Sequence, residues 1–367
     1  MSSERKFMRR ALILVQILVA AILTLTAHGA RAEAPSVIRV AFAGVGIGNR
    51  PFVGGSSLSV VHARGLLEEE FKKDNIKIEW SFFKGAGPAV NEAYANRLLD
   101  FALQGDLPSS IGRAGGLKTK LLAGVSTMQH TYLAVPADSS IASLADLKGK
   151  KVALFKGTNL QLAVNKILAG SGLSERDLRI LNMDSATAKA ALATRDIDAA
   201  FGGYDLLTLQ DQGVAKIVYS TKNDSPAYLR HAHLIVTEDF ANKYPDITRR
   251  VVKVVVQAAH WIAQNEANPA PIYQLWSKSG VPYSNFKADQ TGDSLKVRAS
   301  PLFDEYLISR YKAAVADAKR FGLIRNTFDV DSWIDLRFLN AALKELNLEG
   351  YWPEFDANGK VKHPGRS

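Results

Sequence analysis

The sequence contains no cysteine among its 367 residues. This absence excludes disulfide bonds, a lipid-anchoring cysteine and any cysteine nucleophile. A long apolar run occurs once, at residues 11–27, so no second segment is long enough to span a bilayer. Runs of five or six like charges and nucleic-acid-binding motifs are also absent. We therefore expect no nucleic-acid partner and a stability that comes from an apolar core.

The first 32 residues differ in composition from the rest. Four basic residues lie between positions 5 and 10, the apolar run follows, and Ala-Arg-Ala stands at 30–32. This order is typical of a cleaved secretory signal peptide. We predict a signal peptide over 1–32 and an exported, periplasmic chain that begins at Glu33. An uncleaved membrane anchor is the alternative.

The remaining chain has the composition of a globular protein, with 47% apolar and 22% charged residues overall. Its length is sufficient for two domains. Of the formal net charge of +10, residues 1–32 carry +4, which leaves +6 on the rest. Because this charge is dispersed, it indicates a weak attraction for small anions rather than a polyanion-binding face.

Strand and helix patterns alternate in two similar units. The first runs from residue 37 to 130 and the second from about 150 to 221. Such alternation predicts α/β units with mainly parallel sheets covered by helices. Two extended stretches, 131–137 and 231–237, bracket the second unit and indicate an inserted domain joined by a two-strand hinge. We expect lobe 1 at 33–130 plus 235–345, lobe 2 at 131–234, and an irregular tail at 346–367.

The segment QGDLPSS (104–110) ends an apolar strand and begins a helix. Helix N-termini have free N–H groups and a positive dipole end, so they bind anions. Gly105 permits close approach of a ligand to the backbone, and Pro108 fits the first helical position. Ordinary helix capping is the alternative explanation for any one such corner.

Similar corners recur at 82–90, 154–162, 181–190 and 201–207. This repetition in both units favours one shared anion-binding cleft. Lys84, Lys156 and Arg230 are the cations nearest the corners, and Lys156 is the expected ionic partner of the ligand. The predicted ligand-binding residues are Asn49, Gly85, Gly87, Gln104, Gly105, Leu107, Pro108, Ser109, Lys156, Gly157, Thr158, Asn159, Asp184, Tyr204, Asp205 and His231.

Five segments carry a resemblance to a known family: EWSFFKGAGPAVNEA (79–93), LDFALQGDLPSSIGRAGG (99–116), YLAVPADSSIASLADLKGKKVALFKGT (132–158), GLSERDL (172–178) and ATRDIDAAFGGYD (193–205). In order and spacing they resemble the solute-binding proteins of ABC importers for aliphatic sulfonates, taurine and nitrate. The resemblance implies a two-lobed, type II-like periplasmic-binding fold that closes on its ligand. It also implies a membrane permease with ATPase subunits as partners.

The resemblance leaves the ligand open within one class. An alkanesulfonate is the expected ligand, and nitrate, bicarbonate, taurine or an aromatic acid are the alternatives. A zwitterion such as taurine would need a carboxylate to accept its amine, and Asp106 and Asp205 are the candidates. Asp106 is the weaker of the two, because its position favours capping. We expect a monomer.

Three other functions are disfavoured by the residues. GVGIGN (44–49) lacks the third glycine of a dinucleotide fingerprint, so no cofactor is expected. His231 and His233 lack a third ligand at matching spacing, so no metal is expected. Ser109 has no histidine nearby in sequence, and a related enzyme branch that makes a thiamine precursor is cysteine-rich. We therefore expect binding without catalysis.

Overall fold

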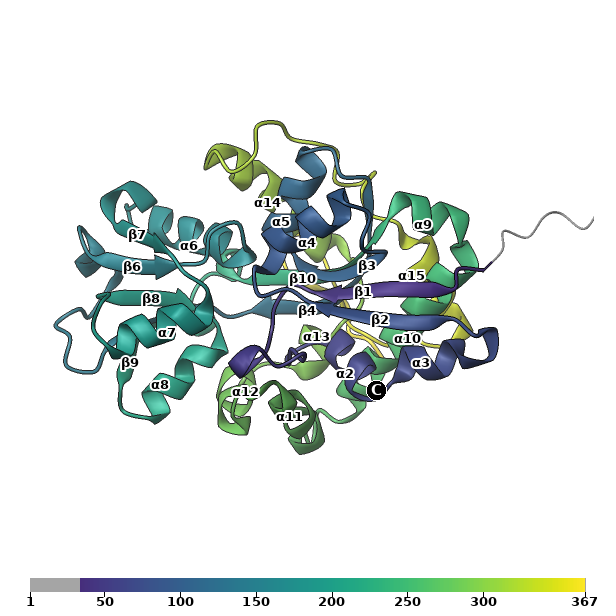
Figure 1. Cartoon of the computed structure of the whole chain (residues 1–367), viewed down its shortest axis with the longest axis horizontal. Helices are drawn as coiled ribbons and strands as arrows, with labels where there is room; N and C mark the ends of the chain where they lie inside the picture. Colours follow the sequence, from purple (N-terminus) through teal and green to yellow (C-terminus); the bar gives the residue numbers. More distant parts are fainter. Residues whose placement is uncertain (1–33, 367) are drawn as a thin grey trace, which may run out of the picture. The chain divides into compact units, whose positions relative to one another are not determined.

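The computed structural model describes residues 34–366, and the predicted signal peptide lies outside this range. Two five-stranded sheets form the framework, and helices cover both faces of each (Figure 1). Both sheets are mixed, since two of the four pairings in each are parallel and two are antiparallel. The α/β prediction with two domains is thus confirmed, although the sheets are less parallel than expected.

The first sheet has the strand order β2-β1-β3-β10-β4. Its strands are β1 (Val37–Phe42), β2 (Lys77–Phe82), β3 (Phe101–Gly105), β4 (Thr119–Gln129) and β10 (Arg230–Thr237). The helices of this part up to β4 are α2 (Ser57–Ala63), α3 (Leu66–Phe71), α4 (Ala86–Ala95) and α5 (Asp106–Ala114). Those after β10 are α9 (Glu238–Lys243), α10 (Pro245–Gln264), α11 (Ala270–Trp276), α12 (Tyr283–Gln290), α13 (Leu295–Arg298), α14 (Glu305–Arg320) and α15 (Leu336–Glu345).

The second sheet has the corresponding order β7-β6-β8-β5-β9. Its strands are β5 (Tyr132–Pro136), β6 (Lys151–Leu154), β7 (Arg179–Asn182), β8 (Ala199–Gly202) and β9 (Ala215–Ser220). Its helices are α6 (Asn159–Gly170), α7 (Ser185–Ala193), the 3-10 helix η5 (Tyr204–Leu206) and α8 (Leu207–Asp211). Further 3-10 helices in the chain are η1 (Ile47–Asn49), η2 (Lys72–Asp74), η3 (Leu144–Leu147), η4 (Glu175–Asp177), η6 (Thr221–Asn223), η7 (Pro226–Tyr228) and η8 (Ser277–Ser279).

Each sheet contains one strand that runs antiparallel to both of its neighbours. In the first sheet this strand is β10, which lies between β3 and β4. In the second it is β5, which lies between β8 and β9. The chain leaves the first sheet after Gln129 and returns to it at Arg230. The two crossings lie at 130–131 and 221–229, whereas the stretches predicted as hinge strands, 131–137 and 231–237, form β5 and β10 inside the sheets.

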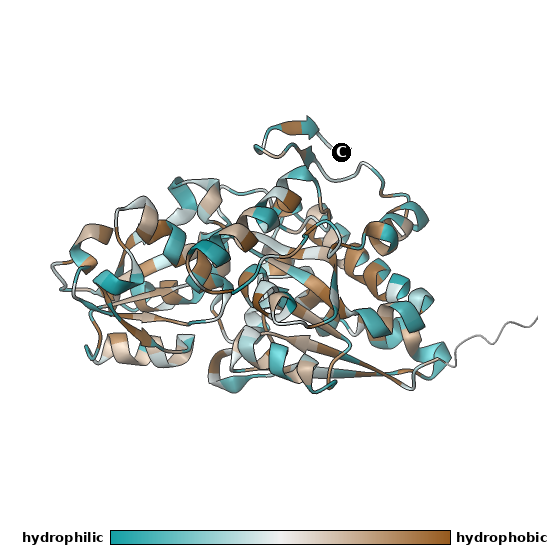
Figure 2. Ribbon diagram, turned by 90° about the horizontal axis from the view of Figure 1, so that it is seen from above, coloured by the Kyte–Doolittle hydropathy of each residue, from teal (hydrophilic) through white to brown (hydrophobic). Residues whose placement is uncertain are grey.

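Alternation along the strands divides the core into layers. Val40 and Phe42 pack with α2, α3 and α10 on one face of the first sheet, whereas Ala41 packs with α4, α5 and α14 on the other. The second sheet is likewise covered by α6 on one face and by α7 and α8 on the other. Figure 2 shows hydrophobic residues along the strands and hydrophilic residues on outward helix turns. Among the described residues, no helix is long and apolar enough to cross a membrane.

Two segments differ in detail from their predicted form. The helical spacing of residues 58–75 predicts one helix, but Gly65, with a left-handed φ of 62°, separates α2 from α3, and η2 follows α3. The tail contains a two-stranded hairpin, β11 (Glu354–Phe355) with β12 (Val361–His363), and is anchored by the fully buried Trp352. Both features depend on side-chain packing that local periodicity does not reveal.

Candidate anion-binding site

Corners from the two sheets lie against each other at several points. A Cβ on Gly105 would lie 2.8 Å from the Cβ of Asn159, and a Cβ on Gly157 would lie 2.9 Å from Cγ of Pro88. The Tyr204 hydroxyl donates to the carbonyl of Gly54 at 3.2 Å. The structure therefore brings together the predicted corners at 82–90, 104–110 and 154–162, and it places Tyr204 of the 201–207 corner against Gly54.

Arg230 is the buried cation at this junction. It begins β10 at the crossing between the sheets, and only 9% of it is exposed. Its Nε donates to Oγ1 of Thr131 at 3.1 Å, Nη1 to Oδ1 of Asn159 at 3.5 Å, and Nη2 to the carbonyl of His130. One N–H on each terminal nitrogen remains for a ligand, since a guanidinium has five N–H donors.

Arg230 has no ion pair with any carboxylate in residues 34–366. No carboxylate oxygen lies within 4.0 Å of its guanidinium. Burial lowers the pKa of Arg230, and Asp289, Asp106 and Asp205 only partly oppose this shift from a distance. A buried charge without a close partner is costly, so this position favours a bound anion. The sequence placed Arg230 near the corners but gave no sign of its burial.

A chain of hydrogen bonds behind the corner fixes Ser109. Its Oγ lies 2.9 Å from Nε2 of His233 and donates to Oε1 of Gln104 at 3.0 Å. Nδ1 of His233 contacts the hydroxyl of Tyr311. If Tyr311 donates to Nδ1, then Nε2–H donates to Ser109, and every hydrogen in the chain has an acceptor. Burial lowers the pKa of His233 to about 3, so the ring is neutral.

These contacts bear on two expectations for Ser109: that it has no nearby histidine, and that it binds ligand. Ser109 does have a histidine partner, 124 positions away, which sequence spacing could not show. Yet Ser109 is 2% exposed and its hydroxyl hydrogen is already directed at Gln104. Gln104 in turn donates to Oδ1 of Asn91 at 2.8 Å and to the carbonyl of Gly87 at 3.1 Å. These buried hydrogen bonds hold the corner at 104–110 in place.

Asp106 is buried at the start of α5. It is 4% exposed, and Oδ1 accepts the N–H of Leu107 at 2.6 Å. Burial raises the pKa of Asp106 to about 6, although Lys166 and Arg230 lower it in part. Helix α5 begins at Asp106, two residues earlier than expected, so Pro108 is its third residue rather than its first. Gly105 is the N-cap and Asp106 does not cap the helix, but its carboxylate is buried rather than open.

The other acidic candidates are paired with lysines. Oδ2 of Asp205 lies 3.1 Å from Nζ of Lys189 and also accepts the hydroxyl of Ser185. Asp184 caps α7 by accepting the N–H of Thr187 at 2.9 Å, and Lys84 lies 3.7 Å from it. Although burial raises it, these contacts hold the pKa of Asp184 below its ordinary value.

Lys156 and the other residues of its corner have partners of their own. Nζ of Lys156 lies 3.0 Å from Oε2 of Glu175, so it is not a free cation. The N–H of Gly157 donates to Oε1 of Gln161 at 2.7 Å. Thr158 takes the predicted N-cap position of α6, but its hydroxyl donates to the carbonyl of Phe155 instead of capping. Asn159 is thus the polar side chain of this corner that contacts Arg230.

Several predicted residues lie outside this cluster of contacts. Nδ1 of His231 accepts the N–H of Met128 at 3.3 Å, and its ring lies near those of Tyr306 and Tyr311. Asn49 is exposed on η1. Leu107 lies in the core and Gly85 at the start of α4, whereas Gly87 belongs to the cluster, because its carbonyl accepts from Gln104 and a Cβ on it would lie 2.3 Å from the Cβ of Pro108.

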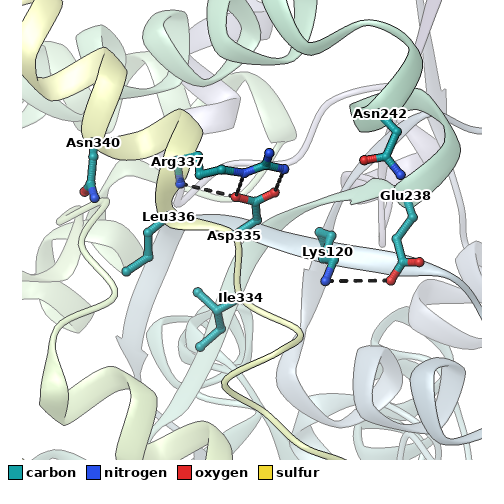
Figure 3. A pocket seen from close by; sticks show the side chains of 8 residues that line it. All are labelled: Lys120, Glu238, Asn242, Ile334, Asp335, Leu336, Arg337 and Asn340. Carbon is teal, nitrogen blue, oxygen red and sulfur yellow. Dashed lines mark hydrogen bonds and ion pairs between the residues drawn. The ribbon is translucent and has the colours of Figure 1, made fainter.

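A separate hollow of about 720 Å³ contains none of the predicted residues (Figure 3). It lies at the opposite end of the first sheet, where β4 begins and β10 ends. Its charged side chains are matched, since Asp335 binds Arg337 and Glu238 lies 3.9 Å from Lys120. No group of three or more potential metal ligands occurs among the described residues.

Comparisons with known proteins agree with this architecture. The profile of the NMT1/THI5-like family matches residues 71–268, more than half of the chain. A Bacillus subtilis protein named as an aliphatic sulfonates-binding protein is 28% identical over 59% of this chain. This chain spans 65% of that relative's length. A crystal structure of a periplasmic sulfonate-binding protein from Methylobacillus flagellatus is 35% identical, with a TM-score of 0.74, and covers 88% of this chain and 98% of its own.

The chain therefore belongs to the NMT1/THI5-like family and has the two-domain fold of periplasmic binding proteins. An enzyme shares this fold. A crystal structure of a desulfurization enzyme matches with a TM-score of 0.62 at 17% identity, over 84% of this chain and 99% of its own. The fold alone consequently does not separate binding from catalysis, and the separation depends on the site.

Proposed function

We propose that this protein is the extracytoplasmic solute-binding component of an ABC importer and captures a small organic oxyanion, an alkanesulfonate. The buried Arg230 without a carboxylate partner is the observation that carries this proposal. An oxyanion would supply the missing negative charge and accept the two remaining N–H groups, as in bidentate pairing of arginine with planar or tetrahedral anions. Relatives named for sulfonate binding support the choice of ligand.

The mechanism is closure of two lobes, lobe 1 at 33–130 plus 235–345 and lobe 2 at 131–234. Arg230 contacts Thr131 on the outgoing crossing and Asn159 at the start of α6. Arg230 itself begins β10 of the first sheet, so an anion bound here would contact elements of both sheets and stabilise the closed arrangement by its differential affinity. A permease with ATPase subunits in the inner membrane would then recognise the closed protein. The protein acts as a periplasmic monomer in this proposal.

Binding without catalysis is favoured by the state of the nucleophile candidate. Ser109 and His233 resemble a nucleophile and its base, but both are buried and Ser109 also donates to Gln104. A catalytic pair must reach the reacting atom of a substrate. The hydrogen-bond chain instead holds α5 in place.

A thermal-shift panel on the chain from Glu33 tests the proposal. It compares ethanesulfonate, longer alkanesulfonates, nitrate, sulfate, bicarbonate and aromatic acids. A ligand at about 100 times its dissociation constant stabilises the native state by about 2.7 kcal/mol. We expect stabilisation by the sulfonate series. No shift with any of these anions contradicts the proposal, and product formation after incubation would indicate an enzyme instead.

A further inference from the structure

One carboxylate at the proposed site lies close to Arg230. Oδ1 of Asp205 and Nη2 of Arg230 lie 3.6 Å and 3.4 Å from the position that a Cβ on Gly203 would occupy. The two charged groups thus border the same glycine, yet they form no ion pair within 4.0 Å. A ligand with an anionic group on Arg230 could direct a second group toward Asp205.

Lys189 neutralises Asp205 at this point. The lysine lies one helical turn into α7, and its Nζ is 3.1 Å from Oδ2 of Asp205. Both side chains are mostly buried, with 16% of Lys189 and 20% of Asp205 exposed. The Ser185 hydroxyl donates to the same oxygen. Because the pair is shielded from solvent, its charges cancel more effectively than those of a surface ion pair.

The other carboxylates near the corners are masked as well. Asp184 lies 3.7 Å from Lys84, and Asp106 is 4% exposed with its Oδ1 accepting the N–H of Leu107. Neither Arg230 nor Asp106 has an ion pair, but Asp106 is buried, so no described carboxylate near Arg230 is both unpaired and open. The balance of charge at this site suits an anion without a cationic substituent.

We propose that Lys189 determines specificity by masking Asp205, so that the site accepts alkanesulfonates and rejects sulfonates that carry an ammonium group. The proposal rests on the proposed function, since it assumes that a sulfonate binds at Arg230. An ammonium group near Asp205 would gain little from a carboxylate that is already paired and would be repelled by Lys189. Lys189 itself need not contact the ligand.

Ethanesulfonate and 2-aminoethanesulfonate are matched probes, because they differ by a single ammonium group. Their dissociation constants are measured by titration calorimetry on the natural chain and on Lys189→Met. We expect the natural chain to prefer ethanesulfonate by at least about ten-fold, an electrostatic effect of ordinary size. Lys189→Met exposes the Asp205 charge, so it should reduce this preference by about ten-fold or reverse it.

Lys312→Met is the control, since Lys312 pairs with Asp331 at 2.8 Å on α14, an element without predicted site residues. It removes the same charge and should leave the preference unchanged. Lys189→Gln retains a hydrogen-bond donor without the charge, and it replaces Lys189→Met if that variant does not fold. Equal affinities in the natural chain, or an unchanged preference in both folded Lys189 variants, overturn the inference. Absence of ethanesulfonate binding to the natural chain instead contradicts the proposed function.

Discussion

At the scale of single residues, Arg230 shows how a binding site can be deficient in the free protein. A guanidinium at 9% exposure loses most of its hydration, while three neutral oxygens satisfy only part of its donors. Such a residue contributes little to stability and can even oppose folding. An anion that compensated this charge would gain free energy that a more exposed lysine such as Lys156 could not provide.

Replacement of Arg230 should separate binding from stability. Arg230→Met should weaken sulfonate binding by about 100-fold or more, because a charge-assisted bidentate contact is lost. Its melting temperature without ligand should not fall, since the unpaired charge is removed. Arg230→Lys should also bind poorly, because an ammonium cannot reproduce the planar fork. Normal affinity in both variants, measured by calorimetry, would contradict the placement of the site.

Asp106 should make stability depend on pH. Its pKa in the folded protein, about 6, lies above the ordinary value of 3.8. The folded state therefore binds the proton more readily, and this residue's contribution to stability rises as pH falls from about 6 to 4. Above pH 6 the charged form costs about 3 kcal/mol.

The Asp106→Asn variant tests this assignment. It should raise the melting temperature at pH 8 by several degrees and leave it little changed at pH 4. Asp138→Asn is the control, because that side chain is 62% exposed and should have no comparable effect. Equal stability of Asp106→Asn and the natural chain at pH 8 would show that the carboxylate is better solvated than its burial indicates.

At the scale of elements, the strand-to-helix corners need small residues where they meet. Gly157 has φ of 74° and leaves no room for a Cβ beside Pro88, whereas Gly149 has φ of 73° with nothing within 4 Å. The two glycines thus share a left-handed backbone and differ only in their surroundings. Substitutions at the two glycines can therefore separate the cost of backbone strain from the effect of disturbing the contact between corners.

Gly157→Ala and Gly149→Ala form a matched pair of variants. Each should lower the free energy of unfolding by about 1 kcal/mol, the cost of a left-handed alanine. Only Gly157→Ala should also weaken sulfonate binding, by about ten-fold or more, since its Cβ pushes Pro88 away. Denaturant unfolding and calorimetry measure the two effects. An equal loss of affinity in both would mean that the Gly157 corner does not form part of the site.

The elements themselves were largely predictable, and the site was only partly so. The apolar runs that end in glycine or polar residues located β1, β3, β6 and β8, because burial and turn chemistry are local signals. Tertiary contacts are not local signals. Ser109 contacts His233, 124 positions away, and Arg230 contacts Asn159, 71 positions away. Sequence could therefore name Lys156 as the ionic partner but could not show that Glu175 already pairs with it.

At the scale of the whole chain, α12 follows β10 and contacts η5 and α8, which belong to the part of the chain around the second sheet. Nδ2 of Asn285 donates to the carbonyl of Tyr204 at 3.0 Å and to Oγ1 of Thr208 at 2.7 Å. Asn285 is 1% exposed, so these bonds are protected from water. This contact holds η5, with Tyr204 and Asp205, against the part of the chain that follows β10.

A pair of introduced cysteines can report closure, because the sequence has none of its own. In Thr208→Cys with Asn285→Cys, mild oxidation should join the two thiols in a disulfide, because the natural side chains are in contact, and saturating ethanesulfonate should increase the rate of disulfide formation at least about three-fold by population shift. Each single-cysteine variant is the control and should show no intramolecular product on a gel. A rate that does not respond to ligand, in protein that binds it, would contradict closure of lobes.

The position of β10 also has a kinetic consequence. This strand lies inside the first sheet, between β3 and β4, but it lies more than 90 residues beyond β4 in the chain. The first sheet therefore stays incomplete until the whole second unit has been synthesised, and its closure involves a long loop, which slows folding. The strand order that places Arg230 at the site thus also determines when the protein can become native.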